Sequence, residues 1–490
     1  MLSVTVRRAW KPAIILCGVM FLIGPEPVIS AAADPNKAEV SENIFDFVPD
    51  REQQTLQEKS DRQLSLSPSA RQDFLRTVVK RTFIKVDWQK LFTMASLKMS
   101  VSLPFLDGAK VVFAPEVFRK ITHPRNQGSG GNDRYEWIGE AHVDGMNEVG
   151  DAVFIFNEGK KTVSGTIQLE GVILQILPLQ GDSYQIFHID PARFPDDDQV
   201  TPNPLFNDKL KKKNRAGSTG ANADPERWGA KSRLVQSGED SSSICTIDLL
   251  VLYTTAALEA ARANGQDILD EIDAAVASAN WSFVRSGVKA WLQLAVDPFE
   301  LPNFEENNSL RINLDELHDP NTSPGKDVEE FRNGNQADLV SLWVAKGTDA
   351  CGWSNENVPD DLIDAIALSV VKLSCAVSKF SFTHEIGHLM GAGHDRFANG
   401  ARSTDTRFNH GHVSLAAKKY TLMGLGTLCR DKGVNCRRLN RWSSPTQTYL
   451  NRTDIMRGAA EGSDAADNVR VLNETACKVA KFRPLASVGG

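Results

Sequence analysis

The chain has 490 residues, of which 41% are hydrophobic and 24% charged, and these ordinary values exclude collagen-like, wholly disordered and polytopic membrane proteins. This length is too great for one ordinary domain and indicates roughly two or three. The net charge of -7 gives no reason to expect nucleic acid or an anionic membrane surface as a partner.

The first 33 residues have the pattern of a secretory signal peptide. Arg7 and Arg8 precede an apolar run from Ala13 to Ile23, which three alanines at 31–33 follow. The run is shorter than the roughly 20 apolar residues that span a bilayer, so export is favoured over a stable membrane anchor. We therefore expect a secreted, extracellular protein, or a periplasmic one if the source is a Gram-negative bacterium.

Short alternating runs separated by Gly, Asn and Asp predict a β-rich domain over residues 34–200, although residues 33 to about 69 are polar and aperiodic. The expected strands are Tyr135–Val143, Val153–Phe156, Thr162–Ile167, Val172–Ile176 and Tyr184–Ile189. Residues 201–243 are rich in Pro, Asp, Lys, Asn, Gly and Ser and predict a linker. A basic cluster at 211–215 makes protease processing the second interpretation of this segment.

The cysteines mark a domain boundary near Cys245. Of the 7 cysteines, Cys17 lies in the predicted signal and all the others lie at or after position 245. An even set in an exported chain indicates disulfides, and the paired C-x-x-C spacing of a cysteine zinc cluster is missing. Six cysteines allow about 15 pairings, so the sequence favours only Cys429 with Cys436, which would close a small loop.

Residues 244–490 predict an α/β domain, because short continuous apolar runs alternate with segments of helical period. The expected strands are Ile247–Tyr253, Ala290–Val296, Asp338–Val344 and Ile366–Val371. Helices are expected from Ile268 to Phe283 and from about Asp467 to Phe482.

Residues 384–395, HEIGHLMGAGHD, carry the pattern that predicts chemistry. His384 and His388 are four residues apart, so on a helix both imidazoles project from one face about one turn apart. Gly391 stands where the helix could end in a left-handed residue, and that turn would bring His394 to the same metal ion. Three imidazoles leave a fourth position for water, as in catalytic zinc sites.

Zinc is the expected ion, since three neutral imidazoles with an open position form its hydrolytic arrangement. Zinc acidifies water and polarises a carbonyl, and Glu385 would take the water proton as general base and pass it to the leaving amine. The pattern therefore predicts hydrolysis of peptide bonds. A bare H-E-x-x-H is weak evidence, but the extended string would arise by chance on the order of once in a million at ordinary residue usage.

The string matches H-E-x-x-H-x-x-G-x-x-H, the metzincin signature, and the following Asp395 resembles the reprolysin (adamalysin) branch. The segments IDLLVLYT, DLVSLWV with the Cys351 that follows it, and DNVRVLNETACKVAKF are similar to bacterial reprolysin-like and peptidyl-Asp metalloendopeptidases, so the resemblance covers most of residues 245–485. It implies a twisted mixed sheet, an active-site helix and a small C-terminal subdomain. It also implies a tight turn with a Met beneath the zinc, for which Met423 is the candidate.

Two departures from the family pattern affect the expected mechanism. Some relatives have a Tyr two residues after the Met, but this chain has Leu425, so catalysis would depend on zinc and Glu385. Many metzincins are kept latent by a propeptide Cys, and residues 34–244 contain none. If the β-rich segment is a propeptide, it would fill the cleft or supply another ligand such as an Asp. We expect it to assist folding and to inhibit until it is removed.

Charge is uneven within the predicted catalytic domain. Most charged side chains of residues 245–395 are acidic, and most of those of residues 396–490 are basic. Complementary packing of two subdomains is the simpler explanation. The sharper hypothesis is that a basic residue of the second segment binds an acidic substrate side chain beside the scissile bond, as the peptidyl-Asp resemblance implies. His410 and His412 are interpreted as structural or substrate-facing, and His318 as a solvated loop residue.

The sequence thus predicts an exported zinc metalloendopeptidase made as a precursor, acting on proteins or peptides, with its own propeptide as inhibitor and folding aid. A calcium requirement is left open because no pattern supports it. Two alternatives are a secreted binding protein on an inactive scaffold and a closed structural zinc domain. The intact set of His384, Glu385, His388 and His394 disfavours both.

Overall fold

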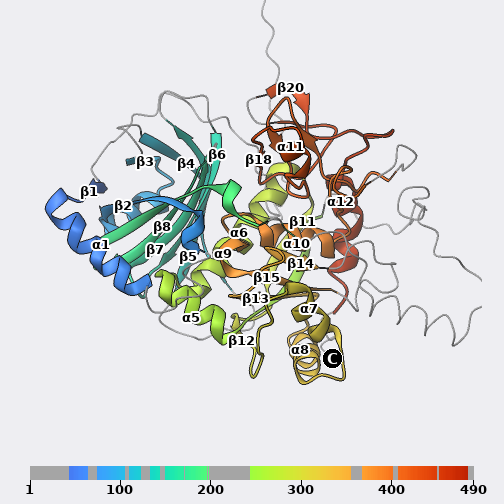
Figure 1. Ribbon diagram of the computed structural model, residues 1–490, viewed down its shortest axis with the longest axis horizontal. Helices are drawn as coiled ribbons and strands as arrows, with labels where there is room; N and C mark the ends of the chain where they lie inside the picture. Colours follow the sequence, from blue (N-terminus) through green and yellow to red (C-terminus); the bar gives the residue numbers. More distant parts are fainter. Residues whose placement is uncertain are drawn as a thin grey trace, which may run out of the picture. The chain divides into compact units, whose positions relative to one another are not determined.

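The computed structural model describes residues 44–64, 74–104, 110–122, 133–143, 149–169, 172–195, 197, 243–354, 367–400, 407–449 and 452–483. The predicted signal peptide and all of the predicted linker except Ser243 lie outside the described residues. The described residues fall within one compact unit that contains two large sheets (Figure 1). None of the described helices is both long enough and apolar enough to cross a membrane.

The first sheet, here called the N-terminal sheet, has nine strands in the order β1-β2-β9-β8-β7-β6-β5-β4-β3, and every pair is antiparallel. Its strands are β1 Phe45–Phe47, β2 Val78–Val86, β3 Val101–Pro104, β4 Lys110–Lys120, β5 Arg134–Val143, β6 Val149–Asn157, β7 Thr162–Leu169, β8 Val172–Gln180 and β9 Ser183–Ile189. An aromatic cluster that includes Phe113, Trp137, Phe154 and Phe156 fills one face. The prediction of a β-rich N-terminal region is confirmed.

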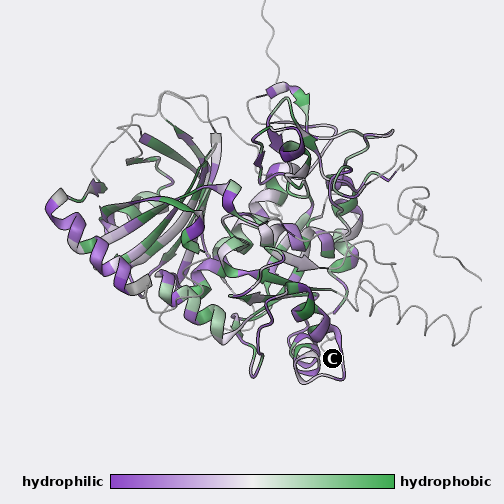
Figure 2. Cartoon of the chain, in the orientation of Figure 1, coloured by the Kyte–Doolittle hydropathy of each residue, from purple (hydrophilic) through white to green (hydrophobic). Residues whose placement is uncertain are grey.

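The N-terminal region also holds elements that the sequence did not predict. Within the polar, aperiodic segment that ends near residue 69, Asp50–Leu64 form helix α1. This helix is almost wholly hydrophilic (Figure 2) and buries little beyond Leu56, which packs with Val48 and Phe83. Helix α3, Trp88–Ser96, and strands β1 to β4 were likewise not expected; in β4 the pairing register shifts beside Pro115, which disturbs the alternation of apolar residues.

The second sheet, here called the C-terminal sheet, has the order β11-β10-β13-β15-β14, with β12 beside β10. Its strands are β10 Cys245–Tyr253, β11 Ala290–Leu294, β12 Phe299–Glu300, β13 Leu339–Val344, β14 Gly352–Ser354 and β15 Leu368–Lys372. All pairs are parallel except the edge pair of β14 with β15. Parallel strands that are covered on both faces have continuous apolar sequences. For this reason four strands of this sheet could be predicted from the sequence.

Helices alternate with these strands or follow them in the chain, and most of them contact the sheet. They are α5 Thr255–Asn264, α6 Ile268–Ser286, α7 Leu310–His318, α8 Ser323–Gly334, α9 Leu373–Ala376, α10 Ser381–Leu389, α11 Thr427–Asp431 and α12 Asn468–Val479. The long predicted helix is α6, which ends where Gly287 adopts a φ of 76°. The mixed α/β architecture predicted for this part is confirmed, whereas His318 is the half-buried last residue of α7 and not a loop residue.

The described strands after α10 are short: β16 Val413–Ser414, β17 Lys419–Tyr420, β18 Arg437–Arg438, β19 Thr448–Tyr449 and β20 Arg452–Met456. Three disulfides brace residues 245–477. They join Cys245 to Cys477, Cys351 to Cys375, and Cys429 to Cys436, so the one pairing that the sequence favoured is confirmed.

Helix α6 lies between the two sheets. Its apolar residues share one core with Ile138, Val153 and Ile155 of the N-terminal sheet and with β10 and β11 of the C-terminal sheet. Polar contacts add to this, since Asp151 of β6 accepts hydrogen bonds from Trp281 on α6 at 2.9 Å and from Arg441 at 2.9 and 3.1 Å. The N-terminal sheet is therefore docked on the C-terminal part through a continuous buried interface.

Candidate active site

Helix α10 places the first two histidines of the motif. It begins at Ser381 after a turn in which Phe380 has a φ of 60°, and the Phe380 carbonyl accepts the first helical hydrogen bond from the His384 N–H at 2.9 Å. All nine of its residues are buried. A helix that is buried all round cannot move without disturbing the core, so its side chains are held firmly.

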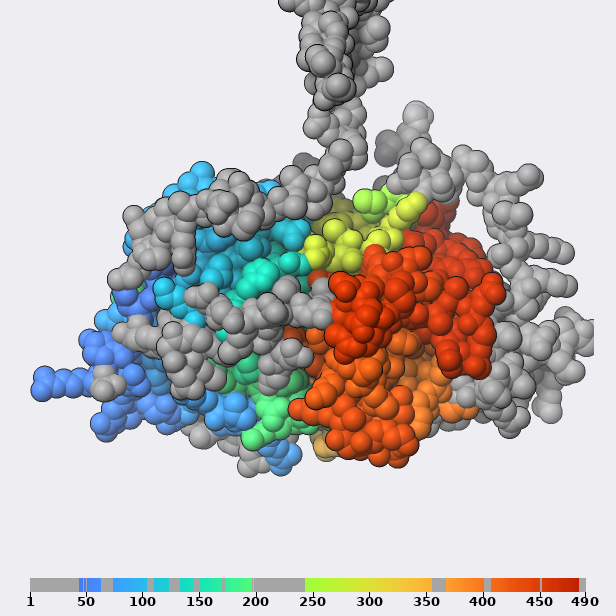
Figure 3. All heavy atoms as spheres, turned by 90° about the horizontal axis from the view of Figure 1, so that it is seen from above, coloured from blue at the N-terminus to red at the C-terminus, as the bar shows by residue number. Residues whose placement is uncertain are grey.

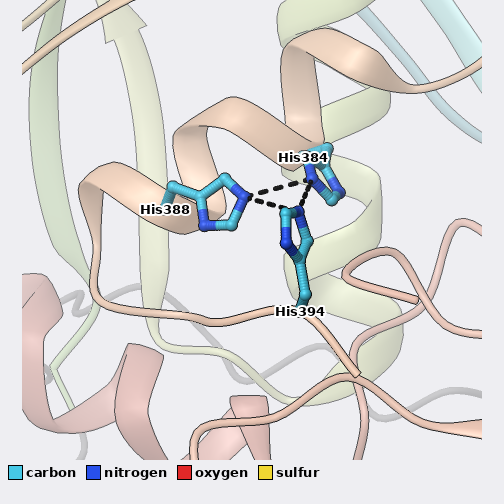
Figure 4. Close-up of side chains that lie close together, drawn as sticks. All are labelled: His384, His388 and His394. Carbon is cyan, nitrogen blue, oxygen red and sulfur yellow. Dashed lines mark hydrogen bonds between the residues drawn. The ribbon is translucent and has the colours of Figure 1, made fainter. Parts of the chain in front are cut away.

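The three histidine rings converge, with His384 and His388 on α10 and His394 in the segment that follows (Figure 4). Their Nε2 atoms lie 3.0 Å apart for His384 and His394, and 3.1 Å apart for the other two pairs. Among the described residues this is the one group of His, Cys, Asp or Glu side chains arranged to hold a metal ion.

Backbone carbonyls orient two of the rings. His384 Nδ1 lies 2.8 Å from the Leu422 carbonyl oxygen, and His388 Nδ1 lies 2.8 Å from that of Ala392. Because a carbonyl oxygen can only accept, both Nδ1 atoms carry the proton, and in neutral rings the two Nε2 atoms face each other with lone pairs. A cation between them removes this repulsion, so the arrangement fits a metal ion.

Glu385 lies on α10 beside the histidines and is fully buried against the edge strand β14. Its Oε2 accepts a hydrogen bond of 2.6 Å from the Ser354 hydroxyl. A Cβ at Gly352 would come within 2.3 Å of Oε1, so only glycine leaves room for the carboxylate at that position. Neither β14 residue could be identified from the sequence, because both lie 30 or more positions before the motif and belong to no pattern within it.

Met423 lies in a tight turn beneath α10, closed by a 2.8 Å hydrogen bond from the Gly424 N–H to the Thr421 carbonyl. A Cβ at Gly387 would meet the Met423 sulfur at 2.8 Å and the Trp442 ring at 2.7 Å. The absence of a side chain at this helical position lets both groups pack directly against the helix between His384 and His388.

The segment after α10 turns back at Gly391, whose φ of 93° lies in the region that favours glycine. Asp395 then ties His394 to the Met423 turn, since its Oδ1 accepts from the N–H groups of Phe397 and Ala398 at 3.1 Å and its Oδ2 from that of Leu425 at 2.8 Å. Burial raises the pKa of the Asp395 carboxyl, and these hydrogen bonds oppose the shift.

His410 and His412 lie near the three converging histidines and bind neighbouring groups of the chain. His410 Nδ1 lies 2.9 Å from the His394 carbonyl oxygen, so it orients the backbone of the third histidine. His412 Nδ1 lies 2.8 Å from the Tyr449 hydroxyl, and burial lowers the pKa of its ring.

A basic cluster lies at the start of α10, and no sequence pattern indicated it. Lys379, Ser381 and Arg438 surround the carboxylate of Asp197, a fully buried residue beyond β9. Burial raises the pKa of this carboxyl, but Arg438, Lys379, His384 and the Ser381 hydrogen bond outweigh it and hold the pKa well below its usual range.

Known proteins resemble this chain in the same region. Residues 245–424 match the model of metallo-peptidase family M12, Reprolysin_5. A peptidyl-Asp metalloendopeptidase of Stenotrophomonas maltophilia strain R551-3 is 29% identical over 70% of this chain and 73% of its own length. Peptidyl-Asp metalloendopeptidases of S. maltophilia strain K279a and of Xanthomonas campestris pv. campestris are each 28% identical, over 69% and 70% of this chain and 72% of their own lengths.

One solved structure, described as a chaperone-substrate complex, aligns over 50% of this chain and 40% of its own with 19% identity and a TM-score of 0.37. The family match, with relatives aligned over about 70% of the chain, confirms the resemblance inferred from the motif. The protein is a metalloendopeptidase whose residues 245–424 resemble metallo-peptidase family M12.

Proposed function

We propose that the protein is a secreted zinc metalloendopeptidase, made as a precursor, that cuts proteins beside acidic residues. The observation that carries this proposal is the convergence of three buried Nε2 atoms within 3.1 Å of one another. Tetrahedral zinc with Zn–N distances of about 2.0–2.1 Å would hold its nitrogens about 3.3 Å apart. His384, His388 and His394 would therefore hold zinc after a small outward adjustment.

Glu385 is the general base of the proposed reaction. When bound, zinc supplies a Lewis acid that acidifies water and polarises the peptide carbonyl. The Glu385 carboxylate lies beside His384 on the same helix, and the Ser354 hydroxyl fixes its Oε2. Its other oxygen, Oε1, would accept a proton from water and deliver it to the leaving amine. Leu425 offers no proton donor at the position where some relatives have a Tyr.

The preference for acidic residues rests on two independent observations. The relatives in S. maltophilia and X. campestris are described as peptidyl-Asp metalloendopeptidases. In this chain Lys379 and Arg438 place two buried cations at the start of the helix that carries His384. Export is supported by the signal pattern of residues 1–33, and the precursor role by the docking of the N-terminal sheet on the rest of the chain.

Digestion of an unstructured protein tests the zinc dependence and the specificity together. The secreted, processed product is incubated with the substrate alone, with a zinc chelator, and with chelator followed by zinc, and every cut is located by mass spectrometry. We expect internal cuts that the chelator abolishes and zinc restores, with Asp and Glu enriched beside them. A zinc-loaded sample that makes no cuts would instead favour a binding protein.

Replacement of Glu385 tests the mechanism. Glu385→Gln keeps the size of the side chain and its contact with Ser354 but removes the base, so turnover should fall about 10²–10⁴-fold. Zinc content and the thermal unfolding midpoint should stay close to those of the unaltered protein. Near-normal turnover with full zinc content would show that Glu385 is not the base.

A further inference from the structure

The basic cluster at the start of α10 is built from three buried side chains that come from two parts of the chain. Ser381 is the first residue of α10, and Lys379 stands two positions before it. Arg438 reaches them from β18, about 40 residues beyond the histidine motif. Ser381 is 0% exposed, Arg438 6% and Lys379 9%, so none of the three is an ordinary surface charge.

The carboxylate of Asp197 occupies this cluster. Its Oδ1 accepts a hydrogen bond of 2.6 Å from the Ser381 hydroxyl. Its Oδ2 pairs with Arg438 and lies 3.6 Å from Lys379 Nζ. Lys379 also donates to the Pro195 carbonyl, so both the side chain and the backbone of this segment are bound. A space-filling view shows the last part of the N-terminal region, in green, directly against the orange part of the chain (Figure 3).

The cluster is joined to the metal site on both sides. Ser381 lies three residues, one helical turn, before His384 on α10. The Arg438 guanidinium donates to the Lys379 carbonyl at 3.2 Å and to the Gly424 carbonyl at 3.0 Å, and Gly424 directly follows Met423. His384 is close enough to Asp197 for its charge to act on the carboxyl. A carboxylate held here therefore lies at the start of the helix that carries His384 and His388.

The charges of the cluster favour a bound anion. Two buried cations face the single negative charge of Asp197, and separating a buried cation from the charge it pairs with is costly. Removal of the Asp197 segment would leave Lys379 and Arg438 without that charge. Lys418, Arg430 and Arg437 add further basic groups around the neighbouring hollow between residues 190–194 and the C-terminal part. Another carboxylate is the group best suited to replace Asp197.

Asp197 does not belong to the metal site itself. Among the described residues, which include Asp197, the group arranged to hold a metal contains only the three histidines. The geometry therefore does not favour Asp197 as the Asp ligand that the N-terminal segment could supply. The carboxylate instead takes the position of a side chain bound next to the reacting centre.

Resting on the proposed function, we propose that Lys379, Ser381 and Arg438 form the pocket that binds the acidic side chain of a substrate, and that Asp197 fills it as a substrate-like inhibitor. The same three side chains then bind the acidic side chain of the substrate and, before activation, the inhibiting Asp197. The Asp197 segment must leave the pocket before an acidic substrate can enter.

Ligand binding tests the pocket without any turnover. In the full chain, Asp197→Ala empties the cluster, and acetate or succinate serves as the probe, with uncharged acetamide as control. We expect both acids to raise the thermal midpoint of Asp197→Ala and to leave that of the unaltered chain unchanged. Asp151→Ala is the matched control, since Asp151 is another buried carboxylate that pairs with an arginine across the interface.

The double variant Asp197→Ala/Lys379→Met locates the bound acid. The response to acetate should be lost in it, because one of the two cations is gone. A response that persists, or one equal to that of Asp151→Ala, would place the acid elsewhere and overturn the pocket. If Asp197→Ala does not fold, Asp197→Ser, which also removes the carboxylate and leaves space for the acid, is used in its place.

Cleavage of paired peptides tests the substrate role. Two quenched peptides differ only in Asp or Asn beside the scissile bond. The zinc-loaded full-chain Asp197→Asn should cut the Asp peptide at least about tenfold faster than the unaltered full chain, because truncating a buried charge pair weakens it by that much or more. Asp151→Asn should show no such gain. In the Asp197→Asn background, Lys379→Met should lower the Asp-to-Asn ratio of kcat/KM at least about tenfold.

The outcomes separate the two proposals. If no variant cuts either peptide while acetate still stabilises Asp197→Ala, the proposed function fails, and the substrate role of the pocket fails with it. If the variants cut but the ratio of kcat/KM is unchanged by Lys379→Met, the function stands and the pocket is overturned.

Discussion

Gly352 and Glu385 show how closely single residues are fitted at this site. A Cβ at Gly352 would lie 2.3 Å from Glu385 Oε1 and 2.7 Å from its Cγ, so Gly352→Ala must displace the carboxylate. Because a shift of about 1 Å in a reacting group can cost about 10²-fold, we expect a loss of at least tenfold in kcat/KM with unchanged zinc content. Gly334→Ala is the control, as nothing lies within 4 Å of its added Cβ.

A Gly352→Ala enzyme with normal activity would mean that the Glu385 carboxylate does not act from the position described. The histidines and Glu385 could be predicted from the sequence, because their spacing in one short motif indicates a metal site. The sequence could not indicate Ser354 or Gly352, whose role arises only when β14 lies beside α10.

The turn after α10 determines whether the third histidine reaches the other two. Gly391 has a φ of 93°, and an L-residue there costs about 1–2 kcal/mol. We expect Gly391→Ala to lower the thermal midpoint and to weaken zinc retention against a competing chelator. Gly400→Ala, at a φ of 57° with nothing within 4 Å, should cost similar stability without affecting zinc retention. Equal zinc retention in both variants would show that the turn does not position His394.

The helices and strands differ in how well they could be predicted from their own sequences. The buried strand β10 and the helices α6 and α12 have strong apolar patterns and were expected. Helix α1 was not, because its sequence DREQQTLQEKSDRQL has almost no apolar face. Contacts such as the 2.7 Å ion pair between Arg81 and Asp61, and burial of Leu56, hold it on the N-terminal sheet. The tertiary environment outweighs local pattern in such a helix.

The interface between α6 and the N-terminal sheet makes the whole molecule sensitive to pH. Asp270 and Glu271 of α6 are buried there, and they accept hydrogen bonds from Asn157 and Gln175 of the N-terminal sheet at 3.3 Å. Burial raises the pKa of Asp270 from 3.8 to about 7 and that of Glu271 from 4.5 to about 7. Around Asp270, Asp267 and Asp273 add to the increase and Arg134 opposes it; Asp267 also raises the pKa of Glu271.

While the N-terminal sheet is docked on α6, Asp270 and Glu271 therefore keep protons that they would release above about pH 4 if the sheet separated from α6. The stabilisation of the docked state is complete below the ordinary carboxyl pKa values and is lost as the pH rises through about 7. Hydrogen exchange of α6 amides in the full chain should report weaker docking at pH 8 than at pH 5, at constant ionic strength. Asp270→Asn/Glu271→Gln should flatten this dependence. Equal protection at both pH values would contradict it.

The amino-acid sequence by itself determined the family resemblance, the histidine motif with Glu385, the broad α/β order of the C-terminal part and one disulfide. These features are encoded locally, in helical spacing, strand-length apolar runs and short loops. Only the tertiary structure decided that Ser354 and Gly352 enclose Glu385, that α6 lies between both sheets, and that Asp197 meets Lys379 and Arg438. Those contacts join residues far apart in the chain, and burial, not spacing, brings them together.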